Sequence, residues 1–241
     1  MVTVAQSPDP PRSSAVPLLL SLNAGYVDTA GFVTLQGLFT AHVTGNFVTL
    51  GAALVLGTSG VLAKLMALPV FCLTVFGARL AGHVLRERRL PAFAILLTAK
   101  LLLLIAAAVM AVALGPFTNG DSVAALATGM ILVCAMSIQN AVHRVHLAWA
   151  PPSTLMTGNT TQIMLDLADL LTGRAGNQGS AMRARLAAMA AAVGVFALGC
   201  AAAALIAHWT GTWCFLVPPL IAAATLSLGA KFDHLPDPPR G

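Results

Sequence analysis

Residues 21–46 decide the fold, and they read SLNAGYVDTAGFVTLQGLFTAHVTGN. The first part of this run is apolar enough for a membrane-spanning helix, yet it contains a carboxylate, Asp28. The run ends with the tripeptide Thr44-Gly45-Asn46. The apolar segment that follows, 47–57, has roughly half of the ~20 residues that a helix needs to cross a bilayer. The pattern therefore predicts a membrane-spanning helix followed by a short half-helix.

The same arrangement recurs at residues 132–159, which read LVCAMSIQNAVHRVHLAWAPPSTLMTGN. Gln139 aligns with Asp28 in this second copy. The second tripeptide, Thr157-Gly158-Asn159, aligns with the first once a two-residue insertion in the second copy is allowed for. A second short apolar stretch, 160–171, follows it. The matching order indicates an internal repeat.

The composition places the chain in a membrane. Of its 241 residues, 58% are hydrophobic and only 9% are charged, against about 25% charged in soluble domains. So few charges cannot coat a soluble globule of this size, which excludes a secreted soluble enzyme, a disordered protein and a nucleic-acid-binding domain. The four cysteines all lie in apolar runs without CxxC spacing, which indicates small buried side chains rather than disulfides or metal ligands.

Six segments are long and apolar enough to cross a bilayer. They are 16–38, 62–85, 91–114, 122–147, 186–207 and 213–230, and the last is short and contains Pro218-Pro219, which predicts a kink or local unwinding. Each copy of the repeat then holds one span, one half-helix and two further spans. Because three crossings are an odd number, the second copy must be inserted upside down, a plan common in transporters. The predicted fold class is an all-α polytopic membrane protein of six transmembrane helices, built from two inverted three-helix repeats, 16–114 and 121–230.

Basic residues predict the orientation. With the N-terminus inside, the outer connections hold only Lys64, at the mouth of the second span. This asymmetry follows the positive-inside rule. We expect a multi-pass protein of the bacterial cytoplasmic membrane with two cytoplasmic tails, 1–15 and 231–241, the first disordered because it is rich in Pro and Ser. The inner segments hold Arg12, Arg86, Arg88, Arg89, Arg144, Arg174, Arg183, Arg185, Lys231 and Arg240.

Asp28 lies about twelve residues into the first span, close to mid-membrane. A charge at that depth costs at least ~2.5–3.5 kcal/mol, so such residues face a polar interior. Asn23 and Tyr26 share its span, and Gln139 and Asn140 take the corresponding positions in the second copy. These residues predict a substrate or proton pathway between the repeats. The alternative is that the polar groups only hold helices together.

Lys100 is the other deep charge, about nine residues into the third span. Its depth matches that of Asp28 on helical rise alone, so we expect an Asp28–Lys100 ion pair and include Lys100 in the pathway. A buried pair need not add stability, but removing one partner strands the other.

Each TGN tripeptide suits the start of a helix. The threonine can cap, the glycine allows an unusual backbone turn, and the asparagine can cap or adopt a left-handed conformation. Free N–H groups at a helix start attract anions, so two inverted copies would present these ends near the middle of the membrane. The alternative is that each tripeptide starts an ordinary helix at the membrane surface.

Other polar residues are expected to be structural. Asp166 and Asp169, three apart on the second half-helix, are expected to be solvated or to pair with the arginines that follow them. His143 and His146 have no third ligand for a metal, and His42 is expected to lie at the membrane interface. We find no nucleophile elbow, P-loop or HExxH motif, so no catalytic set is identified.

The motifs resemble those of a known family. The run AGYVDTAGF, the following G-L-F-x-A-H-V-T-G-N, and the later M-S-I-Q-N-A and T-x-x-T-G-N are similar to the YoaK-type family of small bacterial integral membrane proteins, which carries a domain-of-unknown-function label. The likeness covers essentially the whole chain after the first tail. It implies a bacterial membrane protein with about six spans, and it implies neither an activity nor a substrate.

The leading hypothesis from the sequence is a small-molecule or ion permease whose pathway runs between the repeats. The alternatives are a structural or regulatory membrane protein without transport activity, and a lipid-binding or lipid-modifying protein. The expected partners are the lipid bilayer and an unidentified small molecule or ion, with an oligomer left open. No cofactor, metal or nucleic acid is expected.

Overall fold

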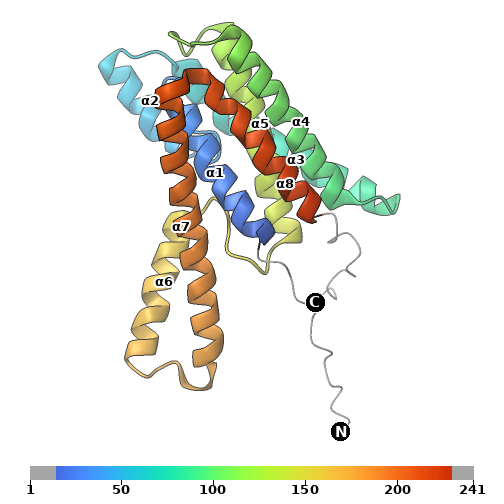
Figure 1. The fold of residues 1–241 in the computed structure, drawn as a ribbon, viewed down its shortest axis with the longest axis vertical. Helices are drawn as coiled ribbons and strands as arrows, with labels where there is room; N and C mark the ends of the chain where they lie inside the picture. The colour runs from blue at the N-terminus through green and yellow to red at the C-terminus, as the bar shows by residue number, and fades with distance from the viewer. Residues whose placement is uncertain (1–14, 230–241) are drawn as a thin grey trace.

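The computed structural model describes residues 15–229, and every element within them is a helix (Figure 1). In chain order the elements are α1 (Ala15–Thr34), α2 (Gly45–Leu56), α3 (Val61–Glu87), α4 (Ala92–Leu114), α5 (Val123–His146), α6 (Met156–Leu171), η1 (Gly176–Gln178), α7 (Gly179–Thr210), η2 (Gly211–Leu216) and α8 (Val217–Gly229), where η marks a 3-10 helix. The predicted tails, 1–15 and 231–241, lie outside the described residues apart from Ala15. The all-α prediction is confirmed.

Five segments are long and apolar enough to cross a membrane: α1, α3, α4, α5 and the helical run Gly176–Gly229 that contains α7 and α8. With the composition, they make the chain a multi-pass membrane protein. The last predicted span, 213–230, is not a long helix of its own. It begins within η2, and Pro218 and Pro219 fall in the first turn of α8, where proline costs no intrahelical hydrogen bond. The segment therefore divides into a 3-10 part and an α-helical part just before the two prolines.

The first span is shorter than predicted. α1 ends at Thr34 rather than at 38, because Gln36 and Gly37 adopt φ values of 55° and 81°, which a right-handed helix cannot continue. The second half-helix begins at Met156, one residue before the second tripeptide, and α7 begins at Gly179 rather than at 186.

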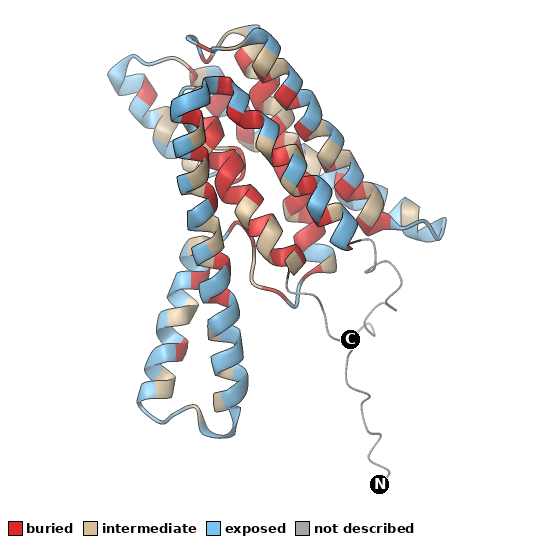
Figure 2. Ribbon diagram, in the orientation of Figure 1, coloured by how far each residue is buried: buried red, intermediate tan, exposed pale blue. Residues whose placement is uncertain are grey.

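α1 and α5 run in opposite directions through the bundle (Figure 1). α1 packs against α7 and α8, whereas α5 packs against α3 and α4. Each half-helix packs against the long helix that follows it, α2 against α3 and α6 against α7, and α4 packs against α8. Figure 2 shows that buried positions concentrate on α1 and α5, whereas α2 and the α6–α7 hairpin are mostly exposed.

The crossing of α1 and α7 is close because of two glycines. A Cβ on Gly25 would overlap the carbonyl oxygen of Phe196, and a Cβ on Gly199 would overlap that of Leu22. Small residues that let two helix backbones approach are typical of helix contacts in membranes. The two helices are therefore in backbone contact at this point.

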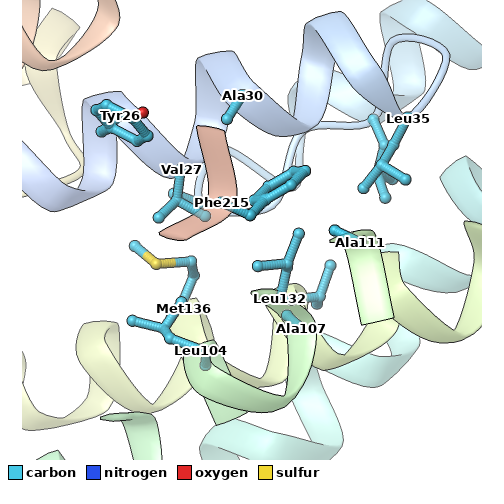
Figure 3. Close-up of a cluster of buried hydrophobic side chains, with 14 of the residues drawn as sticks. Tyr26, Val27, Ala30, Leu35, Leu104, Ala107, Ala111, Leu132, Met136 and Phe215 are labelled. Atoms are coloured by element: carbon cyan, nitrogen blue, oxygen red, sulfur yellow. The ribbon is translucent and has the colours of Figure 1, made fainter. Parts of the chain in front are cut away.

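The interior on one side of this crossing is apolar. Figure 3 shows side chains of α1 meeting those of α4 and α5, with Phe215 of η2 between them. In a bilayer such a core is held by close packing, because lipid tails are as apolar as the side chains. The labelled members are Tyr26, Val27, Ala30, Leu35, Leu104, Ala107, Ala111, Leu132, Met136 and Phe215.

α6 and the first half of α7 form a hairpin that projects beyond the other helices (Figure 1). Arg185 on α7 donates two hydrogen bonds to the carboxylate of Asp166 on α6, at 2.9 and 2.6 Å. Gln162 donates a third, at 2.7 Å. The prediction that Asp166 pairs with a following arginine is confirmed, and this pair ties the two arms of the hairpin together.

Candidate functional site

Asp28 is held by the loop that joins α1 to α2. Its Oδ1 accepts hydrogen bonds from the backbone N–H groups of Thr40 and Ala41, both at 2.7 Å, and a longer one from the Thr40 hydroxyl. Its Oδ2 lies 2.6 Å from Nδ1 of His42 and also accepts from the His42 backbone N–H at 3.3 Å. The Asp28 side chain is 5% exposed, whereas the His42 side chain is 33% exposed. The Asp28–His42 pair therefore joins the buried interior to the surface of the bundle.

The loop can reach Asp28 because it folds back along α1. Asp28 precedes the end of α1 by six residues, which is about 9 Å of helix. Gly31 allows this close return, since a Cβ there would lie 3.2 Å from the Leu38 carbonyl oxygen. α2 begins three residues after His42, so its N-terminus lies beside α1, closer to the middle of the bundle than the C-terminal end of α1.

The loop between α5 and α6 makes contacts at the matching positions of the second copy. Gln139 Nε2 donates to Ser153 Oγ at 3.2 Å, and Thr154 Oγ1 donates to Asn140 Oδ1 at 2.6 Å. In the register that superposes the two tripeptides, Ser153 takes the position of Thr40. Asn140 precedes the end of α5 by six residues, so this loop also folds back by about 9 Å.

The asparagine of each tripeptide fastens its own loop. Asn46 donates to the Phe39 carbonyl oxygen at 2.7 Å and accepts from the Phe39 N–H at 2.9 Å. Asn159 donates to the carbonyl oxygen of Pro152 at 3.0 Å, and Pro152 takes the position of Phe39 in the same register. Proline has no N–H, so the second bond cannot form there.

The predicted capping role of the threonines is not observed. Thr44 stands at the N-cap of α2 but makes no side-chain cap bond, and Thr157 lies within the first turn of α6. Both threonines are exposed. Gly45 is required because a Cβ would lie 2.9 Å from the Phe39 ring, whereas Gly158 borders open space. Of each tripeptide, only the asparagine is buried.

Lys100 is fully buried and does not pair with Asp28. Its Nζ donates to Gln139 Oε1 at 2.6 Å, and the same amide donates to the Leu20 carbonyl oxygen of α1 at 2.8 Å. The predicted Asp28–Lys100 ion pair is therefore wrong. The backbones of α1 and α4 do not approach each other closely, since both helices pack against α5 and α8, and the oxygens of Asp28 already accept bonds from the loop.

Tyr26 and Asn23 lie on successive turns of α1. The Tyr26 hydroxyl donates to the carbonyl oxygen of Cys214 in η2, at 2.9 Å. Asn23 is completely buried, and neither its Oδ1 nor its Nδ2 has a hydrogen-bond partner. An unpaired buried polar group costs about 1–3 kcal/mol, so such a group in a native protein requires an explanation.

Four of the predicted site residues therefore form two groups, while Tyr26 bonds to η2 and Asn23 has no hydrogen-bond partner. Asp28 belongs to the first loop, whereas Lys100, Gln139 and Asn140 are connected through the second. The loop residues Thr40, Ser153 and Thr154 were not among the predicted partners. Extending the register of the two tripeptides back along the chain would have aligned Thr40 with Ser153.

A separate cleft lies where the end of α3 meets the start of α4 and the end of α5. Arg79, Gly82, Arg86 and His146 are among the residues that line it. Gly82 contributes no side chain to the cleft, and a Cβ at this position would meet nothing within 4 Å. Within residues 15–229, no group of three or more His, Cys, Asp or Glu side chains could hold a metal ion.

Comparison with known proteins gives the family. Residues 16–228 match the model of a family described as "protein of unknown function (DUF1275)". The chain belongs to this family. The resemblance of its motifs to the YoaK-type proteins agrees with this DUF1275 match. The matched residues include both returning loops and both tripeptides, so the whole candidate site lies within the DUF1275 region. No curated protein and no solved structure matches the chain.

Proposed function

We propose that this protein is a permease that moves a small molecule or ion between two inverted repeats, 16–114 and 121–230. The observation that carries the proposal is the matched pair of returning loops. Each loop leads into a half-helix and is bonded to a polar side chain six residues before the end of the preceding span, Asp28 in one copy and Asn140 in the other. Because α1 and α5 run in opposite directions, the loops close the bundle from opposite ends (Figure 1). One gate at each side of a buried site is what alternating access requires.

The packing supports an inverted repeat. If α1, α3 and α4 correspond to α5, α7 and α8, then the contacts of α1 with α7 and α8 correspond to those of α5 with α3 and α4. The contact of α4 with α8 then corresponds to itself, as does the contact of α1 with α5. Every one of these pairings has its symmetric counterpart, as expected for two copies related by a two-fold axis.

A sixth crossing fits the dimensions of the last segment. η2 has six residues and α8 has 13. At about 2.0 Å per residue for a 3-10 helix and 1.5 Å for an α-helix, the two together extend about 30 Å, which is the thickness of the hydrocarbon core. η2 follows α7 directly at Gly211, where φ is 58° and the chain reverses.

The first half-helix, α2, fits a re-entrant segment, whereas α6 lies in the hairpin that projects beyond the other helices. α2 carries exposed apolar side chains such as Val48, Val55 and Leu56, which a lipid environment would cover. Both half-helices begin after loops that fold back toward mid-bundle, and irregular backbone at such depth is tolerated where protein satisfies it. The backbone N–H groups of the first loop meet this condition through Asp28.

The proposed location is the bacterial cytoplasmic membrane, with both termini in the cytoplasm. The residues lining the cleft show that the end of α3, the start of α4 and the end of α5 lie together. Arginines gather at this end of the bundle and on the α6–α7 hairpin, which supports a cytoplasmic orientation of both.

Protonation of Asp28 is the proposed coupling step. The first loop opens only if the hydrogen bonds from Thr40, Ala41 and His42 to the carboxylate break. A neutral carboxyl group holds such donors less strongly than a carboxylate does. Proton arrival at Asp28 therefore favours the open gate, with partly exposed His42 as the route to it.

Cysteine accessibility tests the proposal. In a background without the four native cysteines, single cysteines replace exposed Thr44 and Thr157 and buried Thr40 and Ser153. A membrane-impermeant thiol reagent is then applied from each side. We expect Thr44→Cys and Thr157→Cys to react from opposite sides, and the two buried positions to react more slowly, each from the side of its own loop.

Labelling of positions 44 and 157 from the same side would refute the inverted repeat. A complete lack of reaction at positions 40 and 153 in folded protein, while 44 and 157 react, would favour a structural or regulatory protein without transport. The burial of Asn23, Asp28, Lys100 and Gln139 is the observation that favours this alternative.

A lipid-binding or lipid-modifying role is the other alternative, and the cleft beside α3 favours it. Arg79 and Arg86 lie two turns apart on one face of α3 and line a cleft at the basic end of the bundle, a setting typical of anionic headgroup sites. Anionic lipid that protects the protein against thermal unfolding, with protection lost in Arg79→Gln and Arg86→Gln, would support this role.

A further inference from the structure

We infer that the occupant of the site between the repeats is a small anion, received by Lys100 with Gln139 and Asn23. This inference rests on the proposed function and names the substrate class for it. It starts from the charges in the interior. Lys100 is fully buried on α4, and its Nζ has one hydrogen-bond partner, the neutral Gln139 side chain. A lysine ammonium carries three donors, so two of the Lys100 donors remain for an acceptor.

No carboxylate within residues 15–229 compensates Lys100. Asp28, a buried carboxylate of the spans, is fully occupied, since its Oδ1 accepts from two backbone N–H groups and its Oδ2 lies against the His42 ring. A cation entering the interior would therefore compete with these donors for Asp28 and would be repelled by Lys100. An anion meets an available positive charge. The sign of the interior thus favours an anionic substrate.

Gln139 connects Lys100 to the α5–α6 loop, which is the second of the two proposed gates. Its Oε1 accepts from Lys100, and its Nε2 donates to the Leu20 carbonyl oxygen and to Ser153 of the α5–α6 loop. Withdrawal of this loop releases one donor of Gln139 beside the Lys100 ammonium. The same movement that opens the gate therefore adds a neutral donor to the charged one.

Asn23 supplies the third group. It follows Leu20 by three residues, so both lie on one face of α1, and helical side chains lean back toward the N-terminal turn. The Leu20 carbonyl oxygen accepts from Gln139, so Asn23 lies on the face of α1 that carries this contact. Its amide is buried and unpartnered, and its Nδ2 can donate to an anion. Oxygen acceptors of a carboxylate or a small inorganic anion suit this set of donors.

The test is anion binding by the full chain in detergent micelles. The probes are sodium acetate, sodium chloride and sodium phosphate, with ionic strength held constant by sodium gluconate. The midpoint of thermal unfolding and the heat of binding are measured for wild type, Lys100→Met and Asn23→Leu. Lys64→Met is the matched control, because Lys64 is also buried but donates to the backbone carbonyl oxygens of Gln36 and Ser59.

We expect at least one probe to bind wild type saturably, and at least tenfold more weakly to Lys100→Met, with Lys64→Met unchanged. Asn23→Leu is expected to unfold at a higher temperature without anion and yet bind the probe more weakly. A structural role of Asn23 predicts no change in anion affinity. Asn23→Leu also serves as the test if Lys100→Met fails to fold.

Two results would overturn the inference: no saturable binding of any probe to wild type, or equal binding to wild type and to Lys100→Met. Failure here is distinguishable from failure of the permease proposal. If cysteines in the two returning loops react with thiol reagents but no anion binds, only the anionic substrate is refuted. Anion binding behind loops that never react would refute only the transport.

Discussion

The two returning loops lie at corresponding positions of the chain and are fastened by different chemistry. The first loop bonds to a carboxylate through its own backbone N–H groups, at Thr40 and Ala41. The second bonds through side-chain hydroxyls, at Ser153 and Thr154, to the neutral amides of Gln139 and Asn140. Both loops fold back in the same way, although one is bonded to a carboxylate and the other to neutral amides. The fold therefore needs a polar partner at this position but not a charged one. The charge of Asp28 is therefore available for another purpose.

The half-helices show the opposite difference. Asp166 on α6 takes the position of Ala53 on α2 when the two tripeptides are superposed, and both residues are buried against the following long helix. The second half-helix thus carries a carboxylate with an arginine partner where the first has a methyl group. In one copy the carboxylate is bonded to the returning loop, and in the other it lies in the hairpin, so the two loops differ in what could open them.

The largest expected effect compares two helix crossings. Gly25→Leu places a side chain into the Phe196 carbonyl oxygen at the α1–α7 crossing, and overpacking of this kind costs about 3 kcal/mol or more. We expect little folded protein on size-exclusion chromatography in detergent. Gly77→Ala on α3 is the control, because a Cβ there meets nothing within 4 Å. Loss of fold in the control would show that α3 has an unrecognised close contact.

Gln139→Leu is expected to destabilise by about 3 kcal/mol, because it strands the buried Lys100 ammonium. The double variant Lys100→Leu/Gln139→Leu is expected to recover most of that loss, since apolar replacement of both buried polar partners is often nearly neutral. A double-mutant cycle on thermal unfolding in detergent measures the coupling.

Asp28→Leu sharpens the contrast, because the donors it strands include backbone N–H groups that no second substitution removes. We expect no single side-chain change in the first loop to recover its stability. In the double-mutant cycle, additive losses of stability for Lys100→Leu and Gln139→Leu would show that these two residues do not depend on each other.

Asn46→Ala is expected to cost about 2 kcal/mol and Asn159→Ala about 1 kcal/mol, at about 1 kcal/mol per hydrogen bond. The first asparagine makes two bonds to Phe39, whereas the second makes one to Pro152. Thermal unfolding of the two variants side by side measures the ratio. An equal loss in both would show that the bond to the Phe39 N–H contributes little.

The smallest effect concerns Asp121, in the connection between α4 and α5. Burial alone would raise the pKa of this carboxyl. Hydrogen bonds from backbone N–H groups at the start of α3, including those of Gly60 and Leu62, together lower the pKa by more, so it lies below its usual value. A carboxyl whose folded pKa is lowered stabilises the fold above the unfolded pKa of about 4 and loses that contribution as pH falls through the folded pKa.

Acidification below about pH 4 should therefore lower the unfolding temperature of wild type more than that of Asp121→Asn. Measurement of both proteins between pH 3 and pH 7 tests this. An identical pH dependence in the two proteins would contradict the helix-capping role of Asp121.

The sequence predicts the helical class, the family resemblance and the two half-helices, because apolar length and repeated motifs are local properties. It does not predict the partner of Lys100. Depth along two helices is a one-dimensional quantity, and it placed Asp28 beside Lys100 although α5 and α8 separate their helices. The partners of Asp28 depend on the left-handed turn at Gln36 and Gly37, which sends the loop back along α1. Propensity alone gives no sign of that turn at Gln36.

The contact between Lys100 and Gln139 has a consequence for biosynthesis. The two residues are 39 positions apart, and synthesis proceeds from the N-terminus. Lys100 therefore leaves the ribosome before the acceptor of its hydrogen bond does. Asp28 is separated from its first donor by only 12 residues, so its charge is satisfied almost as soon as it is made. The first loop can close during translation, whereas we expect the buried donor of α4 to gain its acceptor only after α5 has followed it.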